Sequence, residues 1–348
     1  MLSRVANTLY WMVRHVERAD NLARLIDVNQ QLLLDYESLD SERLRAFWRP
    51  IILSTGDEEL FDKLYEEAGS AEVIRFLTDD QKNPSSIVSC ISFARENART
   101  VRDQLADELW EELNGLYLFL KSPEGTTMVQ HDTAKFYASI RRSAVTFFGI
   151  AASTMARDEA WEFMDLGRYL ERADKTTRFL DIANFLPAGI DAAGETGSPG
   201  VLHWTAILRS CGAIEAFRAE YQGEITPENV VKFLIFSNDF PRSVRFCLNR
   251  IDQSLHRISH TPRGTFSCEV ERESGRLFSD ISFGSAGEVF DVGLHEYIDR
   301  LQARFNIIGA EIFETYVVMP ERVKSRPSES FTPIADALAW QVEQQQQQ

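Results

Sequence analysis

A pattern of charged residues occurs twice in this chain, 154 positions apart, and it constrains the fold more than any other feature of the sequence. The first copy lies within residues 14–27 and the second within residues 168–181. The charged residues that recur unchanged are Arg14, Glu17, Arg18, Asp20, Arg24 and Asp27. The apolar positions between them differ, as in Val16 against Leu170. Charges on a solvated helix face are usually interchangeable, so their retention indicates specific partners.

Both copies fit an amphipathic helix. At 3.6 residues per turn, four charges of the first copy fall within an arc of about 80°: Glu17, Asp20, Arg24 and Asp27. This arc borders a broad apolar stripe, so we expect the charges at the margin of the buried face. Buried there, they must be satisfied as a network, because an unpaired buried charge costs several kcal/mol.

The repeated charges allow two interpretations. One is a structural lock, in which two copies of a helix cross near a pseudo-twofold axis and arginine–glutamate pairs fix their register. The other is a polar cleft that binds or transforms an anionic or amine-bearing ligand. The residues alone favour the lock, since ion-pair networks often form without any chemistry. In either case we predict that Glu17 and Glu171 are buried and bonded to arginines, with these candidates: Arg14, Arg18, Arg168 and Arg172. The remaining ligand- or partner-binding candidates from the two copies are Asp20, Arg24, Asp174 and Arg178.

Composition limits the class of protein. The 348 residues are ample for a large core in one or two domains. The net charge of −16 argues against a nucleic-acid or anionic membrane surface as partner. We find no signal region and no apolar run long enough to span a bilayer. Four scattered cysteines without CxxC spacing are typical of reduced thiols. We therefore expect a cytoplasmic protein.

Apolar residues recur with a helical period along nearly the whole chain, so we predict an all-α fold. Capping residues before proline, at Asn83-Pro84 and Thr226-Pro227, mark two expected helix starts. The expected helices cover residues 4–36, 41–53, 57–68, 70–78, 84–121, 127–155, 157–186, 200–221, 227–236, 241–260, 265–281 and 286–318.

The similarity between the two copies extends beyond the charged windows and predicts a tandem duplication. Residues 73–77 and 84–86 parallel residues 230–234 and 241–243 at an offset of 157. We therefore predict two related helical bundles, residues 1–154 and 155–320, packed about a pseudo-twofold axis. Residues 321–348, which end in a glutamine run, are expected to form a disordered polar tail.

A second charged cluster lies on another predicted helix and comprises Arg95, Glu96, Asn97 and Arg99. Arginines in line along a helix repel one another unless acids or an anion face them. Solvated arginines and an anion- or partner-binding role are both open here. The corresponding region of the second half contributes Arg242 as a further binding candidate.

Motifs for metal or nucleophilic chemistry are missing from the sequence. None of the six histidines follows a glutamate by three residues, as in ferritin-like bundles. His256 and His260 have a suitable i,i+4 spacing, but the sequence suggests no further ligand. There is no glycine-rich phosphate loop and no nucleophile elbow. We therefore predict no metal site and no cofactor.

Six dispersed motifs cover about residues 1–320: Leu2-Ser3-Arg4-Val5-Ala6, Leu9-Tyr10-Trp11, Arg14-x-x-Glu17-Arg18-Ala19, Ala94-Arg95-Glu96-Asn97-Ala98-Arg99 with Trp110-Glu111, Trp161-x-Phe163-x-x-Leu166-Gly167-Arg168-x-x-Glu171-Arg172-Ala173, and Pro241-Arg242-Ser243. Together they resemble the alpha-E domain family. The first copy departs from that pattern, with Val13 at a usual glycine and His15 at a usual tyrosine. The second copy keeps Gly167 and Tyr169, which implies a close helix contact there.

The resemblance implies an all-helical bacterial protein whose relatives are encoded beside, or fused to, circularly permuted ATP-grasp proteins, often near transglutaminase-like proteases. It implies a helical companion subunit of an ATP-grasp-dependent system that forms amide or peptide bonds or modifies peptides. An amino-acid or peptide ligand in the arginine and glutamate cleft would fit that role. The resemblance supplies no catalytic residues. Two alternatives stay open: a free-standing acid–base enzyme, a hydrolase or transferase, that uses Glu17 or Glu171, and a purely structural interaction module.

Overall fold

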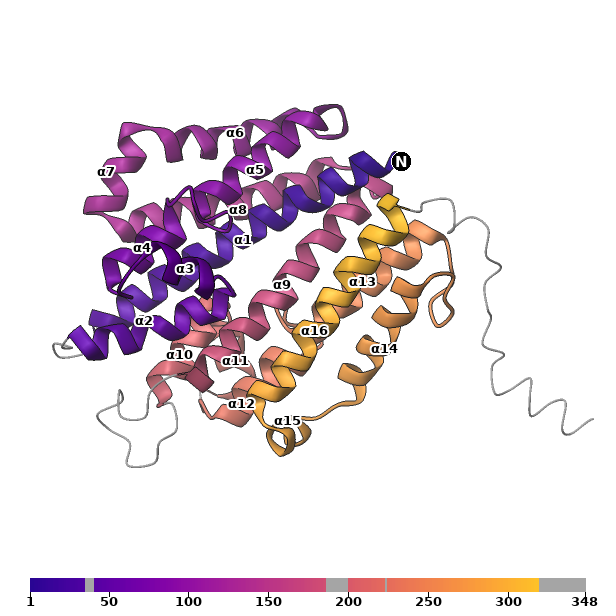
Figure 1. Cartoon of the computed structure of the whole chain (residues 1–348). Coiled ribbons are helices and arrows are strands. Elements are labelled where there is room, and N and C mark those ends of the chain that lie inside the picture. Colours follow the sequence, from indigo (N-terminus) through magenta and orange to yellow (C-terminus); the bar gives the residue numbers. More distant parts are fainter. Residues whose placement is uncertain (35–40, 186–199, 223, 319–348) are drawn as a thin grey trace, which may run out of the picture.

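The computed structural model describes residues 1–34, 41–185, 200–222 and 224–318. Within these ranges the chain forms sixteen α-helices and no strand, which confirms the predicted all-α class (Figure 1). The α-helices are α1 (Ser3–Leu34), α2 (Ser41–Thr55), α3 (Glu58–Leu64), α4 (Ser70–Thr78), α5 (Ile87–Thr100), α6 (Asp107–Lys121), α7 (Pro123–His131), α8 (Thr133–Thr154), α9 (Glu159–Phe185), α10 (Val201–Ser210), α11 (Ile214–Tyr221), α12 (Pro227–Val231), α13 (Val244–Ser259), α14 (Glu269–Phe283), α15 (Ala286–Val292) and α16 (Leu294–Phe313). Three short helical segments of other types join them: η1 (Arg102–Gln104), η2 (Lys232–Phe236) and η3 (Glu314–Val318).

Helices α1 and α9, which carry the two charged windows, pack against each other through the middle of the molecule. Helix α9 lies between α1 and α16 in Figure 1. On the far side of α1 lie α5 and α8, with α6 packed on both. Beyond α9 lie α13 and α16, with α14 packed on both. The two central helices are therefore buried on most faces, charged residues included.

A glycine sets the closest approach of the two central helices. A Cβ atom built on Gly167 of α9 would lie 2.3 Å from the backbone oxygen of Tyr10 in α1. It would also lie 2.7 Å from Cγ2 of Val13, the residue at the matching position of the first copy. Only glycine fits such a backbone approach. The close contact that the sequence implied at Gly167 is confirmed.

Buried apolar side chains from both sides of the central pair form one continuous cluster. The tandem duplication and the pseudo-twofold axis stay predictions, and the predicted tail at 321–348 lies outside the described residues. No helix of the described ranges has the length and apolar character needed to cross a membrane.

Four predicted helices are wrong in their continuity, because each divides into two α-helices. The expected helix at 84–121 breaks at Leu105, whose backbone is extended, and Asp132 caps α8 within the expected helix at 127–155. Gly212 and Gly293 have positive φ angles and end the helices within 200–221 and 286–318. Isolated breaks of this kind leave the hydrophobic periodicity intact, so the periodicity does not predict them.

Of the two helix starts expected before proline, one is confirmed. The side chain of Thr226 accepts a hydrogen bond from the backbone N–H of Asn229 and caps α12. Helix α5 begins instead after Ser86, whose hydroxyl accepts from the backbone N–H of Ser89.

Candidate functional site

Glu17 of α1 is fully buried, and arginines from the second half of the chain hold its carboxylate. Arg172 of α9 forms a bidentate pair, with Nε and Nη2 donating to the two carboxylate oxygens at 2.8 Å each. Arg242, which lies just before α13, donates from Nη1 to Oε1 at 2.9 Å. Arg168 approaches the same carboxylate only to 3.8 Å and stacks on the Phe148 ring.

Glu171 of α9 is equally buried, and arginines of the first half hold it in turn. Arg14 donates from Nε to Oε2 at 2.8 Å. Arg18 donates from Nε to Oε1 at 2.6 Å and from Nη2 to Oε2 at 3.0 Å. Each glutamate therefore pairs with arginines of the opposite copy. The prediction that both glutamates are buried and bonded to arginines is confirmed.

The arginines decide the ionisation of both glutamates. Burial on its own would raise the pKa of Glu17, but the positive charges of Arg172 and Arg242 outweigh it and lower that pKa to about 2. For Glu171, Arg18 and Arg14 outweigh burial in the same way, and its pKa is well below the ordinary value. Both carboxylates are therefore ionised at neutral pH, so neither has a proton to donate as a general acid, and their low pKa makes each a weak general base.

One aspartate–arginine pair continues the network along each of the two helices. Arg24 donates to Asp20 at 3.1 Å, and Arg178 donates to Asp174 at 2.8 Å. Arg242 also donates to Asp20, at 2.6 Å, and so joins two carboxylates on the Glu17 side. The two copies thus repeat their local pairs as well as their sequence.

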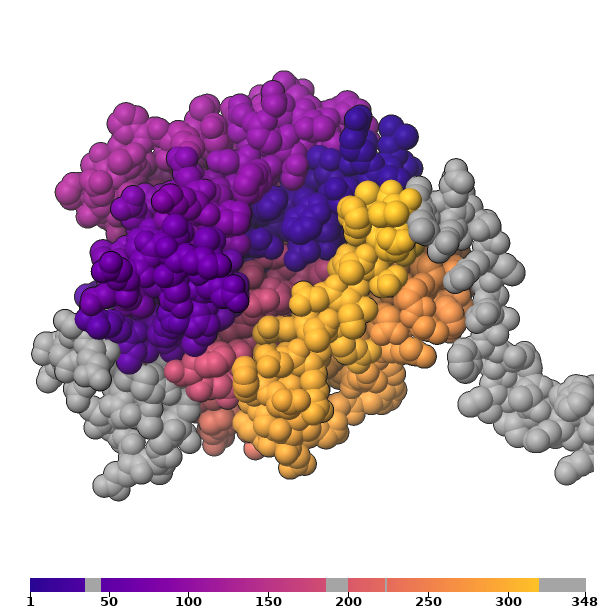
Figure 2. Space-filling view, viewed as in Figure 1, coloured from indigo at the N-terminus to yellow at the C-terminus, as the bar shows by residue number. Residues whose placement is uncertain are grey.

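A cavity of about 540 Å³ opens on the Glu171 side of this network. Helices α1, α9 and α16 line it, together with residues near the ends of α2 and α5. In Figure 2 the surface is hollowed between the yellow α16 and the indigo α1, with α9 at the floor. The candidates from the two charged windows that line the cavity are Arg14, Arg18, Asp174 and Arg178. The candidates outside its lining include the Glu17-side group of Glu17, Asp20, Arg24, Arg168, Arg172 and Arg242.

Lys175 and Ser85 also line the cavity, and neither is among the site residues predicted from the sequence. The Lys175 ammonium lies 3.3 Å from Asp174 and 3.8 Å from Glu171, and burial lowers its pKa. A signal for Lys175 does exist in the sequence, because the matching residue of the first copy is Asn21. A polar position that differs between the two otherwise matching windows indicates that the two copies differ in function there.

The second charged cluster lies apart from the cavity, on α5. Arg95 donates to Asn114 at 2.9 Å and to Glu96 at 2.6 Å, with its guanidinium over the Tyr117 ring. Arg99 pairs with Glu96 and is two-thirds exposed. Neither these residues nor Asn97 belong to the cavity wall. Their contacts are local, to α6 and within α5.

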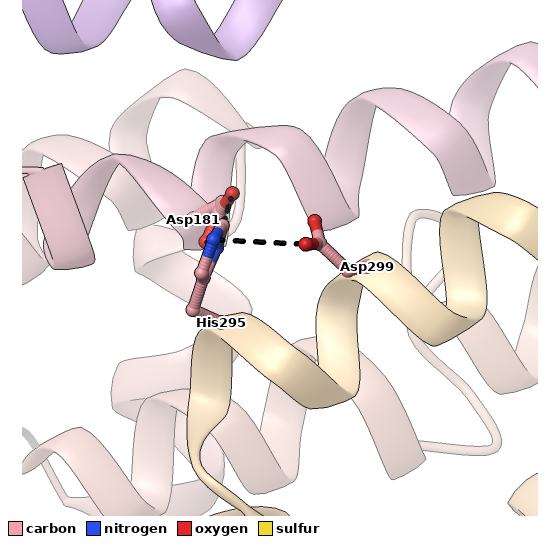
Figure 3. A group of neighbouring side chains, drawn as sticks. All are labelled: Asp181, His295 and Asp299. Carbon is pink, nitrogen blue, oxygen red and sulfur yellow. Dashed lines mark hydrogen bonds and ion pairs between the residues drawn. The ribbon is translucent and has the colours of Figure 1, made fainter.

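A separate polar group joins α9 to the start of α16 (Figure 3). His295 lies between two carboxylates, with Nδ1 2.9 Å from Asp181 and Nε2 3.6 Å from Asp299. Their ligand atoms lie within 4.8 Å of one another, close enough for a metal ion. Asp181 and Asp299 face different ring nitrogens of His295, however, and a single metal ion can bind only one nitrogen of an imidazole ring. The geometry favours a protonated histidine, whose pKa the hydrogen bond to Asp181 raises.

Comparison with known proteins gives a family and few relatives. Residues 1–317 match the model of the Alpha-E family, described as a predicted alpha-helical domain with a conserved ER motif. Uncharacterized proteins of Mycobacterium bovis and of two Mycobacterium tuberculosis strains are 25% identical over 268 residues, or 72% of this chain. The chain covers only 29% of the length of each relative. No solved structure matches it. Both buried glutamates of the network precede an arginine, at Glu17-Arg18 and Glu171-Arg172.

Proposed function

The chain belongs to the Alpha-E family, and on that basis we propose that it is a binding subunit, the helical companion of an ATP-grasp-dependent system that forms amide or peptide bonds or modifies peptides. One observation carries the proposal. The cationic cavity beside Glu171 offers a ligand site, while the glutamates that could have acted as acid or base are held ionised by arginines. The companion would hold the acceptor or the product, and the ATP-grasp partner would activate the carboxyl group.

The lengths of the mycobacterial relatives support the proposal that this chain works with a protein partner. The matched region makes up 29% of each mycobacterial chain, so in those proteins it adjoins a much longer stretch of polypeptide. A domain that works beside another module would have this arrangement. A partner protein also suits a chain with a net charge of −16, which repels nucleic acid.

A second candidate function, the structural interaction module, is favoured by the pairing of the Glu17 carboxylate. Arg172 and Arg242 satisfy this buried carboxylate, and none of these three residues lines the cavity. We propose that the Glu17 side is the lock and that the Glu171 side binds the ligand. The acid–base enzyme is the least supported of the three.

We also propose that the two halves, 1–154 and 155–320, arose by tandem duplication. The crosswise glutamate–arginine pairs support it, and so do two glycines with positive φ. Gly56 lies against Arg178 of the second copy, and Gly212 lies against Arg24 of the first. Cys90 and Cys247 likewise point at the carbonyls of Pro84 and Pro241.

Co-expression with a circularly permuted ATP-grasp protein from the same genome tests the companion role. The tagged chain should co-purify with this partner and elute with it in size-exclusion chromatography at micromolar concentration. Another ATP-grasp enzyme from an unrelated ligase system serves as control and should elute separately. Separate elution of the cognate pair would contradict the companion role.

A further inference from the structure

The Glu17 side of the charge network has Asn21 and Arg242 where the Glu171 side has Lys175 and Ser85. From this difference we infer that the cavity beside Glu171 binds a monoanionic carboxylate attached to an apolar group. The inference rests on the proposed function of this cavity as a ligand site. It does not depend on the identity of the protein partner.

On the Glu17 side, an arginine fills the space next to the network. Arg242 donates from Nη1 to the side-chain oxygen of Asn21 at 2.6 Å, and the same guanidinium contacts Glu17 and Asp20. The Arg242 side chain is only 13% exposed. This end of the network is closed by its own side chains.

On the Glu171 side, both partners of that contact are replaced. Asn21 matches Lys175 at the offset of 154, and Arg242 matches Ser85 at the offset of 157. The short serine leaves the space that a guanidinium would fill, and both replacements line the cavity. The cationic side chain is therefore Arg242, in the loop before α13, on the Glu17 side and Lys175, on α9, on the Glu171 side, where it lines the cavity.

Lys175 has bonding capacity left for a ligand. Its distances to Asp174 and Glu171, 3.3 and 3.8 Å, exceed the roughly 2.7–2.9 Å of a good charge-assisted hydrogen bond. An ammonium group has three donors. Its side chain is 11% exposed, so little water competes for them. A ligand carboxylate in the cavity would supply the short contact that the two protein carboxylates do not.

The charge around this end favours a monoanion. The cations that line the cavity are Arg14, Arg18, Lys175 and Arg178. The carboxylates paired with them are Glu171 and Asp174, and a third, Asp57, lines a small adjoining pocket together with Arg18 and Lys175. Four cations against three carboxylates leave one positive charge. One carboxylate neutralises it, whereas a phosphate dianion would exceed it.

Another part of the cavity wall is apolar and suits a hydrophobic group. Trp11 lies on the α1 side, Phe163 on α9, and Phe305 and Phe313 on α16. The volume of about 540 Å³ is in the usual range of small-molecule sites, about 300–1,000 Å³. An amino acid with an acylated amine and an aromatic side chain matches both parts of the wall.

Isothermal titration calorimetry with N-acetylphenylalanine on the full chain tests the inference, and Trp11 provides a second readout through its fluorescence. We expect saturable one-to-one binding in the millimolar range or tighter. The neutral amide of the same compound should bind about tenfold more weakly, because it loses a charge-assisted bond. Phenyl phosphate should bind no more tightly than the carboxylate. Equal binding of acid and amide, tighter binding of the phosphate, or no saturation would each overturn the inference.

Two variants locate the site. Lys175→Asn installs the residue of the first copy and should weaken binding of the acid about tenfold, with little effect on the amide. Ser85→Arg restores the arginine of the other side and should block the cavity. Lys121→Asn, an exposed change at the end of α6, is the control and should bind like the unaltered chain. Unchanged affinity in Lys175→Asn would overturn the assignment, and if Ser85→Arg does not fold, the comparison of acid and amide still decides.

Failure of this inference and failure of the companion role give different results. A chain that binds the carboxylate but elutes apart from the ATP-grasp protein keeps the ligand site and loses the partner. A chain that elutes with the partner and binds acid and amide alike keeps the partner and loses the carboxylate site.

Discussion

Glu17 and Arg172 face each other across the centre of the molecule, 155 positions apart in sequence, in a bidentate pair with both bonds at 2.8 Å. The Glu17 carboxylate is fully buried, and the Arg172 side chain is 6% exposed. Once such a pair is buried, the stability of the fold depends on both partners, because removing one leaves the other as an uncompensated buried charge.

Glu17→Gln and Glu171→Gln should therefore both destabilise the fold, by about 3–5 kcal/mol each. Urea unfolding followed by circular dichroism measures the change. Glu296→Gln removes an exposed i,i+4 partner of Arg300 and should cost no more than about 1 kcal/mol. Equal and small effects of all three changes would contradict the buried network.

Acid should weaken the fold through these carboxylates. The pKa of Glu17 is lowered to about 2 in the folded chain, against an ordinary value of 4.5. Its contribution to stability is present above the unfolded pKa and is lost as the pH falls toward the folded pKa. The free energy of unfolding should thus drop between about pH 4.5 and 2. In Glu17→Gln the drop over this window should be smaller, and an identical drop would contradict the assignment.

Gly167→Ala should destabilise the contact of α1 and α9, because the new Cβ would meet the Tyr10 backbone oxygen at 2.3 Å. We expect a loss of about 1–3 kcal/mol, the usual cost of overpacking. Gly149→Ala in α8 is the matched control, since its Cβ would meet nothing within 4 Å. That change should stabilise the helix by about 0.5–1 kcal/mol. Thermal unfolding of the two variants should therefore shift in opposite directions.

His295 should titrate above its ordinary pKa of 6.5, because Asp181 accepts a hydrogen bond from its ring. A raised folded pKa contributes stability that is fully present below the unfolded pKa and is lost as the pH rises through the folded pKa. The contact of α16 with α9 should accordingly weaken above neutral pH. NMR titration of the imidazole measures this pKa, and Asp181→Asn should lower it. An imidazole that titrates below 6.5 in the unaltered chain would contradict the ion pair.

The retained charges of the two windows were enough to predict the burial of Glu17 and Glu171. They were not enough to predict the pairing, because Arg168, an equal candidate by sequence, stays 3.8 Å from Glu17. Arg242 takes that place from a loop 225 positions away, a distance that only the tertiary fold closes. The polar cleft at the repeated charges was one of two interpretations of the sequence, but the apolar part of the cavity wall was not predicted, for the same reason. Much of its apolar wall belongs to α16, which carries no motif that distinguishes it from an ordinary core helix.

The crosswise pairing inside the molecule also bears on its response to ionic strength. Salt screens exposed charges over about 10 Å at 0.1 M but has little effect on buried pairs. The contact of α1 with α9 is held by such buried pairs, with the carboxylates of Glu17 and Glu171 both fully buried. Added salt should thus leave this contact almost unchanged while it weakens exposed pairs such as Arg300 with Glu296. The centre of the molecule is built to keep its attraction as the salt concentration rises.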